Sequence, residues 1–469
     1  MRGGQRRKRK LENALRQWWV KARACFLNYA MDSSFLNLEA LIREAGFTMP
    51  GAFAKEAVPR RFLLVGTHAH QTTGYSKVTY NIVKELSKFK DIELFHFGFQ
   101  KFMPSPTDYR KYPAGVDVYD PVEKERNKAS EQEMGFGFSQ LPDYVRKVKP
   151  DVMLIYNDAG IICKFLDKLK SELKPEERTY KLLVYLDQVY VIQRPEFIIR
   201  IDQEVAAYFV FTDFWRETLL KQGIKKPVHV MRHGFDSDAF KPMDRATLRK
   251  KHSIPEHLFI FLNINRNTPR KRHDIVVTAF AEMVARFPTK PLALMSVCDA
   301  GESGGFPIQE IFLRELDRMN VPLQQHAHKL MLSKSSLTYT DEMVNELYAL
   351  SDVGITAADG EGFGLCQFEA MGVGIPQVVP EIGGFTDYAK GGINCQTVKP
   401  KWRSYLALAQ SSVGGMSEVV DPHELALAAE EYIMDSMLRE KHGAAARETV
   451  LAYKWQDEVE KLADVIRTI

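Results

Sequence analysis

The stretch DGEGFGLCQFEAMGVGIP, residues 359–376, decides the fold of this chain. It follows a short apolar run, Val353–Thr356, which indicates a buried strand, and its second half has the composition of a helix. Gly362 and Gly364 allow the backbone to turn tightly and to approach a ligand. Free amides at the start of such a helix attract an anion. The stretch therefore predicts a strand, a glycine loop and a helix with an anion at its N-terminus.

The same stretch carries candidate binding residues. Those near the helix N-terminus are Gly362, Phe363, Gly364, Leu365 and Cys366. Glu369 lies one helical turn after Leu365, and its Cα–Cβ bond tilts back toward the helix N-terminus. Glu369 can therefore offer acceptor oxygens to a ribose diol, whereas Glu361 lies on the loop, nearer to a sugar.

Short apolar runs alternate with helical patterns from Arg61 onward. The predicted strands are Phe62–Val65, Ile92–Phe97, Asp151–Tyr156, Lys181–Leu186, Ala207–Phe211 and Val228–Met231, with helical patterns at Tyr80–Lys88 and Trp215–Gln222. This alternation predicts a parallel, doubly wound sheet.

A second series of the same kind follows a break at residues 233–242. Its predicted strands are Phe259–Asn263, Leu292–Val297, Ser336–Tyr339, Val353–Thr356 and Gln377–Val379, with helices at His273–Arg286 and Asp341–Leu350. The predicted fold class is α/β, with two doubly wound Rossmann-like domains that face a central cleft. The expected parts are an extension at 1–55, an N-terminal domain at 56–235, a C-terminal domain at 236–450 and a last helix at 451–469 that packs back on the N-terminal domain.

Composition places the chain among ordinary globular proteins, with 45% hydrophobic and 26% charged residues. The five cysteines are scattered without a CxxC pair, which argues against a zinc ribbon or a disulfide framework. No run of eighteen apolar residues and no signal-peptide pattern occurs. We therefore expect a cytoplasmic location.

The first 55 residues differ from the remainder in charge. Residues 1–23 hold nine Lys or Arg against one Glu, a local charge of +8, and because the chain carries +4 in total, residues 24–469 carry −4. A globally basic nucleic-acid binder is therefore not indicated. Leu11, Leu15 and Trp18 lie at helical spacing beside the basic residues, which is typical of a helix on an anionic membrane surface. A solubilising tail, or a helix packed on the main body, is the alternative.

From about Phe62 to the C-terminus the sequence resembles family 4 of the retaining glycosyltransferases, which have the GT-B fold. The E-x7-E motif of that family corresponds to Glu361 and Glu369. The other matching stretches are TTGYSKVTYNIVKEL (72–86), HGFDSDAFKP (233–242), NRNTPRKRHDIVVTAFAEM (265–283) and ELYALSDVGI (346–355). The resemblance implies a nucleotide-sugar donor on the C-terminal domain and an acceptor mainly on the N-terminal one.

The resemblance also implies roles for single residues. Arg266 and Lys271 correspond to the basic pair that holds the donor diphosphate, and two fixed cations stabilise the departing diphosphate without a metal. Gly74 corresponds to the glycine of the first βα loop, whose amide reaches the same diphosphate. Glu361 would hold the hydroxyls of the transferred sugar, and Glu369 the ribose.

Other positions depart from the family or carry weaker signals. Cys366 stands where proline is frequent. The acceptor side lacks a clear match to the histidine of the family, so Asp187 and His68, both at strand ends, are its candidate polar contacts. Tyr339 would flank the nucleotide base. Segment 397–421 is longer than the usual link, which suggests a lid or a partner surface.

No metal site is expected. Asp236-Ser237-Asp238 spells a DxD pattern, but it lies in the interdomain match, where Asp236 has a structural counterpart. The histidine pairs at 68 and 70 and at 326 and 328 lack a carboxylate or cysteine at ligand spacing.

We therefore expect an enzyme: a retaining, metal-independent glycosyltransferase that moves a hexosyl group from a UDP- or GDP-sugar to a glycan, lipid or protein-linked hydroxyl. The expected co-substrate is the donor itself, with no further cofactor and no nucleic-acid partner. A sugar-nucleotide epimerase or a phosphorylase of the same fold is the alternative, as is a non-catalytic sugar-nucleotide-binding protein. Peripheral membrane contact through the basic N-terminus stays open.

Overall fold

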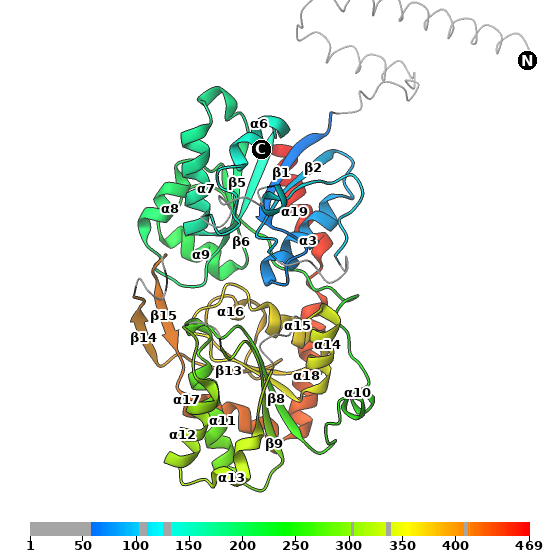
Figure 1. Ribbon diagram of the computed structural model, residues 1–469, viewed down its shortest axis with the longest axis vertical. Helices are drawn as coiled ribbons and strands as arrows, with labels where there is room; N and C mark the ends of the chain where they lie inside the picture. The colour runs from blue at the N-terminus through cyan, green and yellow to red at the C-terminus, as the bar shows by residue number, and fades with distance from the viewer. Residues whose placement is uncertain are drawn as a thin grey trace, which may run out of the picture. The chain divides into compact units, whose positions relative to one another are not determined.

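The structure is a computed structural model, and it describes residues 58–102, 110–124, 133–301, 304–333, 339–407, 411 and 413–469. Residues 59–469 form one compact unit with two large parallel sheets (Figure 1). The basic extension expected at residues 1–55 lies outside the described residues. Within the described ranges, no helix is long and apolar enough to cross a membrane.

The first sheet has seven parallel strands in the order β3-β2-β1-β4-β5-β6-β7. The strands are β1 Arg60–Thr67, β2 Ile92–Phe99, β3 Asp117–Tyr119, β4 Val152–Asp158, β5 Lys181–Asp187, β6 Ala207–Val210 and β7 Val228–Val230. The run Phe62 to Val65 of β1 is fully buried, as parallel sheets covered by helices on both faces require. The strand order reverses between β1 and β4, which creates a crevice at their carboxyl ends.

Helices connect these strands. They are α3 Gly74–Leu86, α4 Pro121–Lys124, α6 Leu141–Val148, α7 Ala159–Glu172, α8 Pro195–Asp202 and α9 Asp213–Lys221, with the 3-10 turn η1 at Pro175–Glu177. A capping box fixes the start of α3: Thr73 Oγ1 accepts from the Ser76 amide at 3.3 Å, and Ser76 Oγ accepts from the Thr73 amide at 3.1 Å. Because α3 follows β1, this cap holds its first turn at the crevice.

The second sheet has six parallel strands in the order β10-β9-β8-β11-β12-β13. The strands are β8 Phe259–Ile264, β9 Leu292–Val297, β10 Leu330–Leu332, β11 Val353–Ile355, β12 Gln377–Pro380 and β13 Gln396–Val398. The helices are α10 Arg245–Lys251, α11 His273–Arg286, α12 Ile308–Arg318, α13 Leu323–His326, α14 Asp341–Leu350, α15 Leu365–Val373, α16 Phe385–Tyr388, α17 Pro422–Met434 and α18 Ser436–Leu451, with 3-10 turns η2 Pro269–Lys271 and η3 Ala327–Lys329.

The two doubly wound sheets confirm the predicted fold class. One strand prediction needs correction: the strand beside β9 is Leu330–Leu332, whereas Tyr339, the described end of the predicted strand, lies in a loop.

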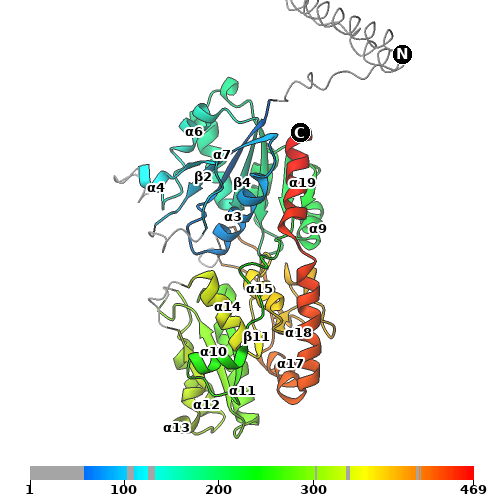
Figure 2. The same cartoon turned by 90° about the vertical axis from the view of Figure 1, so that its right-hand side faces the viewer.

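The two halves of the unit are joined by two neighbouring crossings. The amide of Phe235 donates to the carbonyl of Tyr453 at 2.8 Å. A Cβ on Gly234 would collide with the backbone of Trp455, so glycine permits this approach. After the second crossing, α19 (Trp455–Thr468) packs against α3 and β1 (Figure 2). The last helix thus lies on the first sheet, while the domain boundaries taken from the sequence stay predictions.

Segment 397–421 contains an antiparallel hairpin, β14 Trp402–Tyr405 and β15 Met416–Val419. The amide of Met416 donates to the carbonyl of Val191 at 2.9 Å, in the loop after β5. The amide of Glu418 donates to the carbonyl of Asp359 at 3.0 Å, next to the glycine loop. The hairpin therefore contacts both halves, and its role as a lid or partner surface stays a prediction.

Candidate active site

The glycine loop at residues 359–364 leads into α15 with a fixed backbone. Gly364 precedes the helix with a φ of +88°, in the left-handed region that favours glycine. The hydroxyl of Tyr388 donates to the carbonyl of Gly364 at 2.9 Å. A Cβ on Gly364 would collide with the ring of Phe385. The loop therefore needs glycine here, and it presents the first amides of α15 in one orientation.

Two cations from one short turn contact the first glutamate. In η2, Lys271 Nζ bonds to Oε2 of Glu361, and Arg270 Nη1 lies 3.4 Å from the same oxygen. Burial alone would raise the pKa of Glu361, but Lys271 and Arg270 outweigh it and hold that pKa below its usual value. Burial also lowers the pKa of Lys271. One carboxylate is thus in direct contact with two cations, and Asp187 also interacts with Arg270.

Arg266, the other member of the predicted basic pair, is exposed in the loop between β8 and η2. Its carbonyl accepts from the amide of Thr268 at 2.9 Å. The structure brings Lys271 to Glu361 together with Arg270, a residue that the sequence argument missed. The run of basic residues at 270–272 is the sequence feature that could have indicated Arg270.

The N-terminus of α3 meets the N-terminus of α15. Gly74 is the first residue of α3, and a Cβ there would lie 3.2 Å from Cδ1 of Leu365, the first residue of α15. Each helix end presents unpaired amides and the positive end of a helix dipole. The two glycine-rich loops singled out in the sequence are thus neighbours.

Asp187 reaches the glycine loop from the first sheet. It ends β5, and its Oδ2 accepts a hydrogen bond from the hydroxyl of Tyr75. A Cβ on Gly362 would collide with Asp187 Oδ1, and the indole of Trp215 donates to the carbonyl of Gly362 at 2.7 Å. Burial raises the pKa of Asp187 to about 6. In the described part of the chain Oδ1 has no hydrogen-bond partner, so it can accept from a ligand hydroxyl.

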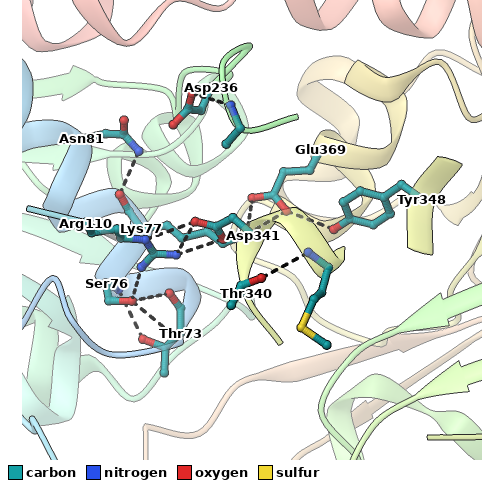
Figure 3. Close-up of polar contacts among 12 residues, drawn as sticks. Thr73, Ser76, Lys77, Asn81, Arg110, Asp236, Thr340, Asp341, Tyr348 and Glu369 are labelled. Atoms are coloured by element: carbon teal, nitrogen blue, oxygen red, sulfur yellow. Dashed lines mark hydrogen bonds and ion pairs between the residues drawn. The ribbon is translucent and has the colours of Figure 1, made fainter. Parts of the chain in front are cut away.

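The second glutamate, Glu369, is bonded to α3 across the crevice (Figure 3). Lys77 Nζ lies 2.7 Å from Oε1 and 3.0 Å from Oε2, and the hydroxyl of Tyr348 donates to Oε2 at 3.0 Å. Lys77 also lies 3.2 Å from Oδ1 of Asp341, whose two oxygens pair with Arg110 at 3.1 and 3.0 Å. Lys77, Arg110 and Asp341 were not predicted from the sequence. The only signal was the place of Lys77 one helical turn after Gly74.

A cavity of about 520 Å³ opens beside this cluster. Its lining includes Lys77, Asn81 and Lys84 of α3, Asp236 and Asp238 of the crossing, and Thr340, Asp341, Leu365 and Glu369 of the second half. Oδ1 of Asp236 accepts from the amides of Asp238 and Ala239, each at 3.2 Å, so this carboxylate caps a turn. Among the residues that the structure describes, no group of three His, Cys, Asp or Glu is placed to hold a metal ion.

Two predicted contacts are buried in the core. Phe363 is buried, with its ring centroid 4.5 Å from that of His233, so its side chain packs inside the protein. His68 is 3% exposed and packs against Tyr112 and His96. Burial, with the neighbouring histidines, lowers the pKa of His68 to about 2, so its imidazole is neutral.

The remaining predicted contacts lie at helix starts. Cys366 is in the first turn of α15, where burial raises the pKa of its thiol. Tyr339 is partly buried and precedes Thr340, the N-cap of α14 whose side chain accepts from the Met343 amide. Its role beside a nucleotide base stays a prediction.

Sequence comparison relates the second half of the chain to a family. Residues 244–449 match the model of the family described as Glycosyl transferases group 1. A D-inositol 3-phosphate glycosyltransferase from Nocardioides sp. is 26% identical over 250 residues, which cover 51% of this chain and 48% of that protein. The chain spans about half the length of the curated relatives it matches.

Solved structures share the arrangement of both sheets. Sucrose-phosphate synthase from Thermosynechococcus elongatus is 14% identical, with a TM-score of 0.64, and the match covers 87% of this chain and 98% of that one. HepE from Anabaena, in complex with UDP and glucose, is also 14% identical, with a TM-score of 0.64 and coverage of 87% and 100%. These likenesses confirm the predicted GT-B fold of two Rossmann-like domains.

Proposed function

We propose that the protein is a glycosyltransferase of the family 4 type, which transfers a hexosyl group from a UDP- or GDP-sugar to a hydroxyl. The observation that carries the proposal is the meeting of two helix N-termini, at Gly74 and Leu365, in the same crevice as Lys271 and Arg270. Two sets of free amides and two cations suit a diphosphate. The match of residues 244–449 to the group 1 family supports the same function.

In the proposed reaction, the bond between the anomeric carbon and a diphosphate oxygen breaks. Negative charge gathers on the leaving diphosphate, where Lys271, Arg270 and the helix amides stabilise it without a metal. Both cations contact Oε2 of Glu361, so Oε1 is available to accept from a hydroxyl of the transferred sugar.

The acceptor hydroxyl attacks the anomeric carbon on the face from which the diphosphate leaves. Its proton passes to an oxygen of the leaving diphosphate, so the path retains the anomeric configuration and needs no enzyme nucleophile. Asp187, whose Oδ1 borders Gly362, would orient this hydroxyl.

The relatives suggest the first substrates to test. A solved HepE structure holds UDP-glucose, so UDP-glucose is the first donor. The curated relatives are named for D-inositol 3-phosphate, so an inositol phosphate is the first acceptor. Glycan, lipid and protein-linked hydroxyls follow.

Donor binding is tested by thermal unfolding with series of UDP- and GDP-sugars. A ligand at 100 times its Kd adds about 2.7 kcal/mol to the free energy of unfolding. We expect at least one sugar nucleotide to stabilise the protein in this way, and Lys271→Met to remove the effect. If no member of either series stabilises the wild-type protein, the proposed function is wrong.

A further inference from the structure

The carboxylate of Glu369, which the proposed function assigns to the ribose, is held by residues of both halves. Lys77 of α3 spans its two oxygens at 2.7 and 3.0 Å, and Tyr348 of α14 donates to one of them (Figure 3). The side chain of Glu369 is only 7% exposed. A buried carboxylate stays ionised only with a nearby counter-charge, and Lys77 supplies one at contact distance.

The second carboxylate near Lys77 has a cation of its own. Asp341 pairs through both oxygens with Arg110, whose side chain is 4% exposed. A bidentate pair of this kind largely neutralises Asp341. Lys77 also lies closer to Glu369, at 2.7 Å, than to Asp341, at 3.2 Å. The charge of Lys77 is therefore directed mainly at Glu369.

The titratable neighbours of Glu369 come from the helices around it. They are Lys77 of α3, Asp341 and Tyr348 of α14, and Cys366 of α15 itself. Helix α18 packs on α15 but directs Arg447 to the carbonyl of Gly372, and β12 carries no titratable residue. Burial raises the pKa of Glu369, Lys77 opposes the rise and Asp341 adds to it.

We propose that Lys77 is a positioning residue of the ribose subsite, which keeps the buried carboxylate of Glu369 ionised and oriented toward the cavity. The inference rests on the proposed function, in which Glu369 accepts hydrogen bonds from the ribose diol. An ionised carboxylate has about four acceptor positions, and Lys77 and Tyr348 take three of them. A diol donates two hydrogen bonds but finds one free position. Lys77 must therefore release one carboxylate oxygen of Glu369 when the diol binds and stay bonded to the other.

The subsite is consequently shared between the two halves. Its carboxylate comes from α15, and its counter-charge comes from the first turn of α3, the helix that also carries Gly74. Donor affinity then depends on a residue of the first half, although the ribose is bound by the second.

The test is the pH dependence of the Kd for UDP-glucose and GDP-mannose, whose diphosphate diesters do not titrate near neutral pH. Lys77→Met removes the charge, and Lys77→Gln removes it but keeps a hydrogen-bond donor. Lys84→Met is the matched control, because Lys84 lines the same cavity on the same helix without a place in the binding machinery. Lys77→Arg tests rescue by a second cation.

We expect Lys84→Met and Lys77→Arg to show the same change in Kd between about pH 6 and about pH 8 as the wild type, in which Asp187 titrates over part of this range. Lys77→Met and Lys77→Gln should lose about tenfold or more in affinity at the lower pH, because Glu369 becomes protonated there. The proposal is overturned if both variants follow the wild-type profile, or if Lys84→Met shows the same loss.

A measurement without ligand separates this proposal from the proposed function. In Lys77→Met the folded state should hold the proton on Glu369 to a higher pH than the unfolded chain does, so stability should fall as pH rises through that interval. The urea midpoint of Lys77→Met should therefore decline more steeply between about pH 5 and pH 8 than that of Lys77→Met/Glu369→Gln, in which only the contribution of other groups such as Asp187 remains. Parallel midpoints would refute the role of Lys77 whether or not a sugar nucleotide binds.

Discussion

Glu361 and Glu369 lie eight positions apart, yet their surroundings shift their pKa values in opposite directions. Lys271 and Arg270 outweigh the burial of Glu361 and hold its pKa low. Glu369 is equally enclosed but contacts one lysine, and burial raises its pKa despite Lys77. The first carboxylate therefore contacts two cations, which suits a site for a diphosphate, and the second contacts one cation, which suits a site for an uncharged diol.

This difference predicts different kinetics for the two glutamine variants. The ribose stays unchanged through the proposed reaction, so Glu369→Gln should weaken ground-state and transition-state binding together and mainly raise the KM for the donor. The transferred sugar gains positive charge in the transition state, so Glu361→Gln should lower kcat about 10- to 1000-fold, or about 1.4–4 kcal/mol. Steady-state kinetics on both variants decide, with circular dichroism as the fold check. A pure KM effect at Glu361 and a lost kcat at Glu369 would reverse the assignment.

Asp187 should make the stability of the protein depend on pH. Its folded pKa of about 6 lies above the ordinary value of 3.8, so the folded protein keeps a proton that the unfolded chain loses between these values. Stability contributed by this group is therefore lost as pH rises through that window. Asp187→Asn should be relatively more stable at about pH 8 than at about pH 4, by about 1–3 kcal/mol. Urea unfolding across this range measures the difference, and parallel curves for the two proteins would contradict it.

At the scale of elements, the backbone of the glycine loop is held in a fixed position at the start of α15. Gly364 combines a left-handed φ with close contact to Phe385 and Tyr388. Gly392 has a φ of +72°, but a Cβ added there would meet nothing within 4 Å, so Gly392→Ala isolates the cost of the backbone conformation.

We expect Gly392→Ala to destabilise the protein by about 1–2 kcal/mol, the cost of placing alanine in the left-handed region. Gly364→Ala should cost at least about 1–3 kcal/mol more, because the ring of Phe385 must also shift. Urea unfolding measures both. Equal losses at the two positions would mean that the loop tolerates a side chain at Gly364.

The sequence predicted the central elements well and the edge elements poorly. The bounds of β9, α11 and α14 agree with the structure, because β9 is a continuous buried run and the two helices carry buried apolar residues at helical spacing. Of the four edge strands, each three residues long and partly exposed, β3 and β13 were missed and β10 was misplaced, whereas β7 was predicted at Val228–Met231. Such strands lack the continuous apolar run by which inner strands are recognised.

The candidate site was predictable where one stretch of sequence forms it. The glycine loop, Glu361 and Glu369 belong to one short segment whose local pattern predicts a binding site, whereas Lys271 was predicted through the resemblance to a family. Lys77 and Glu369 are 292 positions apart, and no local sequence pattern predicts that they form an ion pair. Only the packing of the two halves brings that pair together.

At the scale of the whole described unit, polar contacts hold the two halves together on more than one side. The guanidinium of Arg232, which follows β7 in the first half, pairs with Asp387 of α16 in the second half. Lys77 and Arg110 pair with Glu369 and Asp341 at the crevice. If a donor binds at the crevice as proposed, it must act on contacts that also join the halves.

The basic extension gives a prediction that concerns the chain as a whole. Its local charge of +8 should attract anionic lipid headgroups. Deletion of residues 1–55 should abolish binding to vesicles that contain phosphatidylserine, while transfer to a soluble acceptor continues. Vesicle sedimentation tests this, and equal binding by the full-length and shortened proteins would show that the extension is not the anchor.

The proposed transfer reaction is measured as the release of free nucleoside diphosphate from UDP- and GDP-sugars, with and without acceptor, in excess EDTA. We expect at least one donor to give acceptor-dependent release under these conditions, and Glu361→Gln to slow it about tenfold or more. The linkage formed should keep the anomeric configuration of the donor. Binding of sugar nucleotides without release for any acceptor would make the protein a binder instead of a transferase. Release that stops in EDTA and returns with Mn²⁺ or Mg²⁺ would contradict the metal-free site of Lys271 and Arg270.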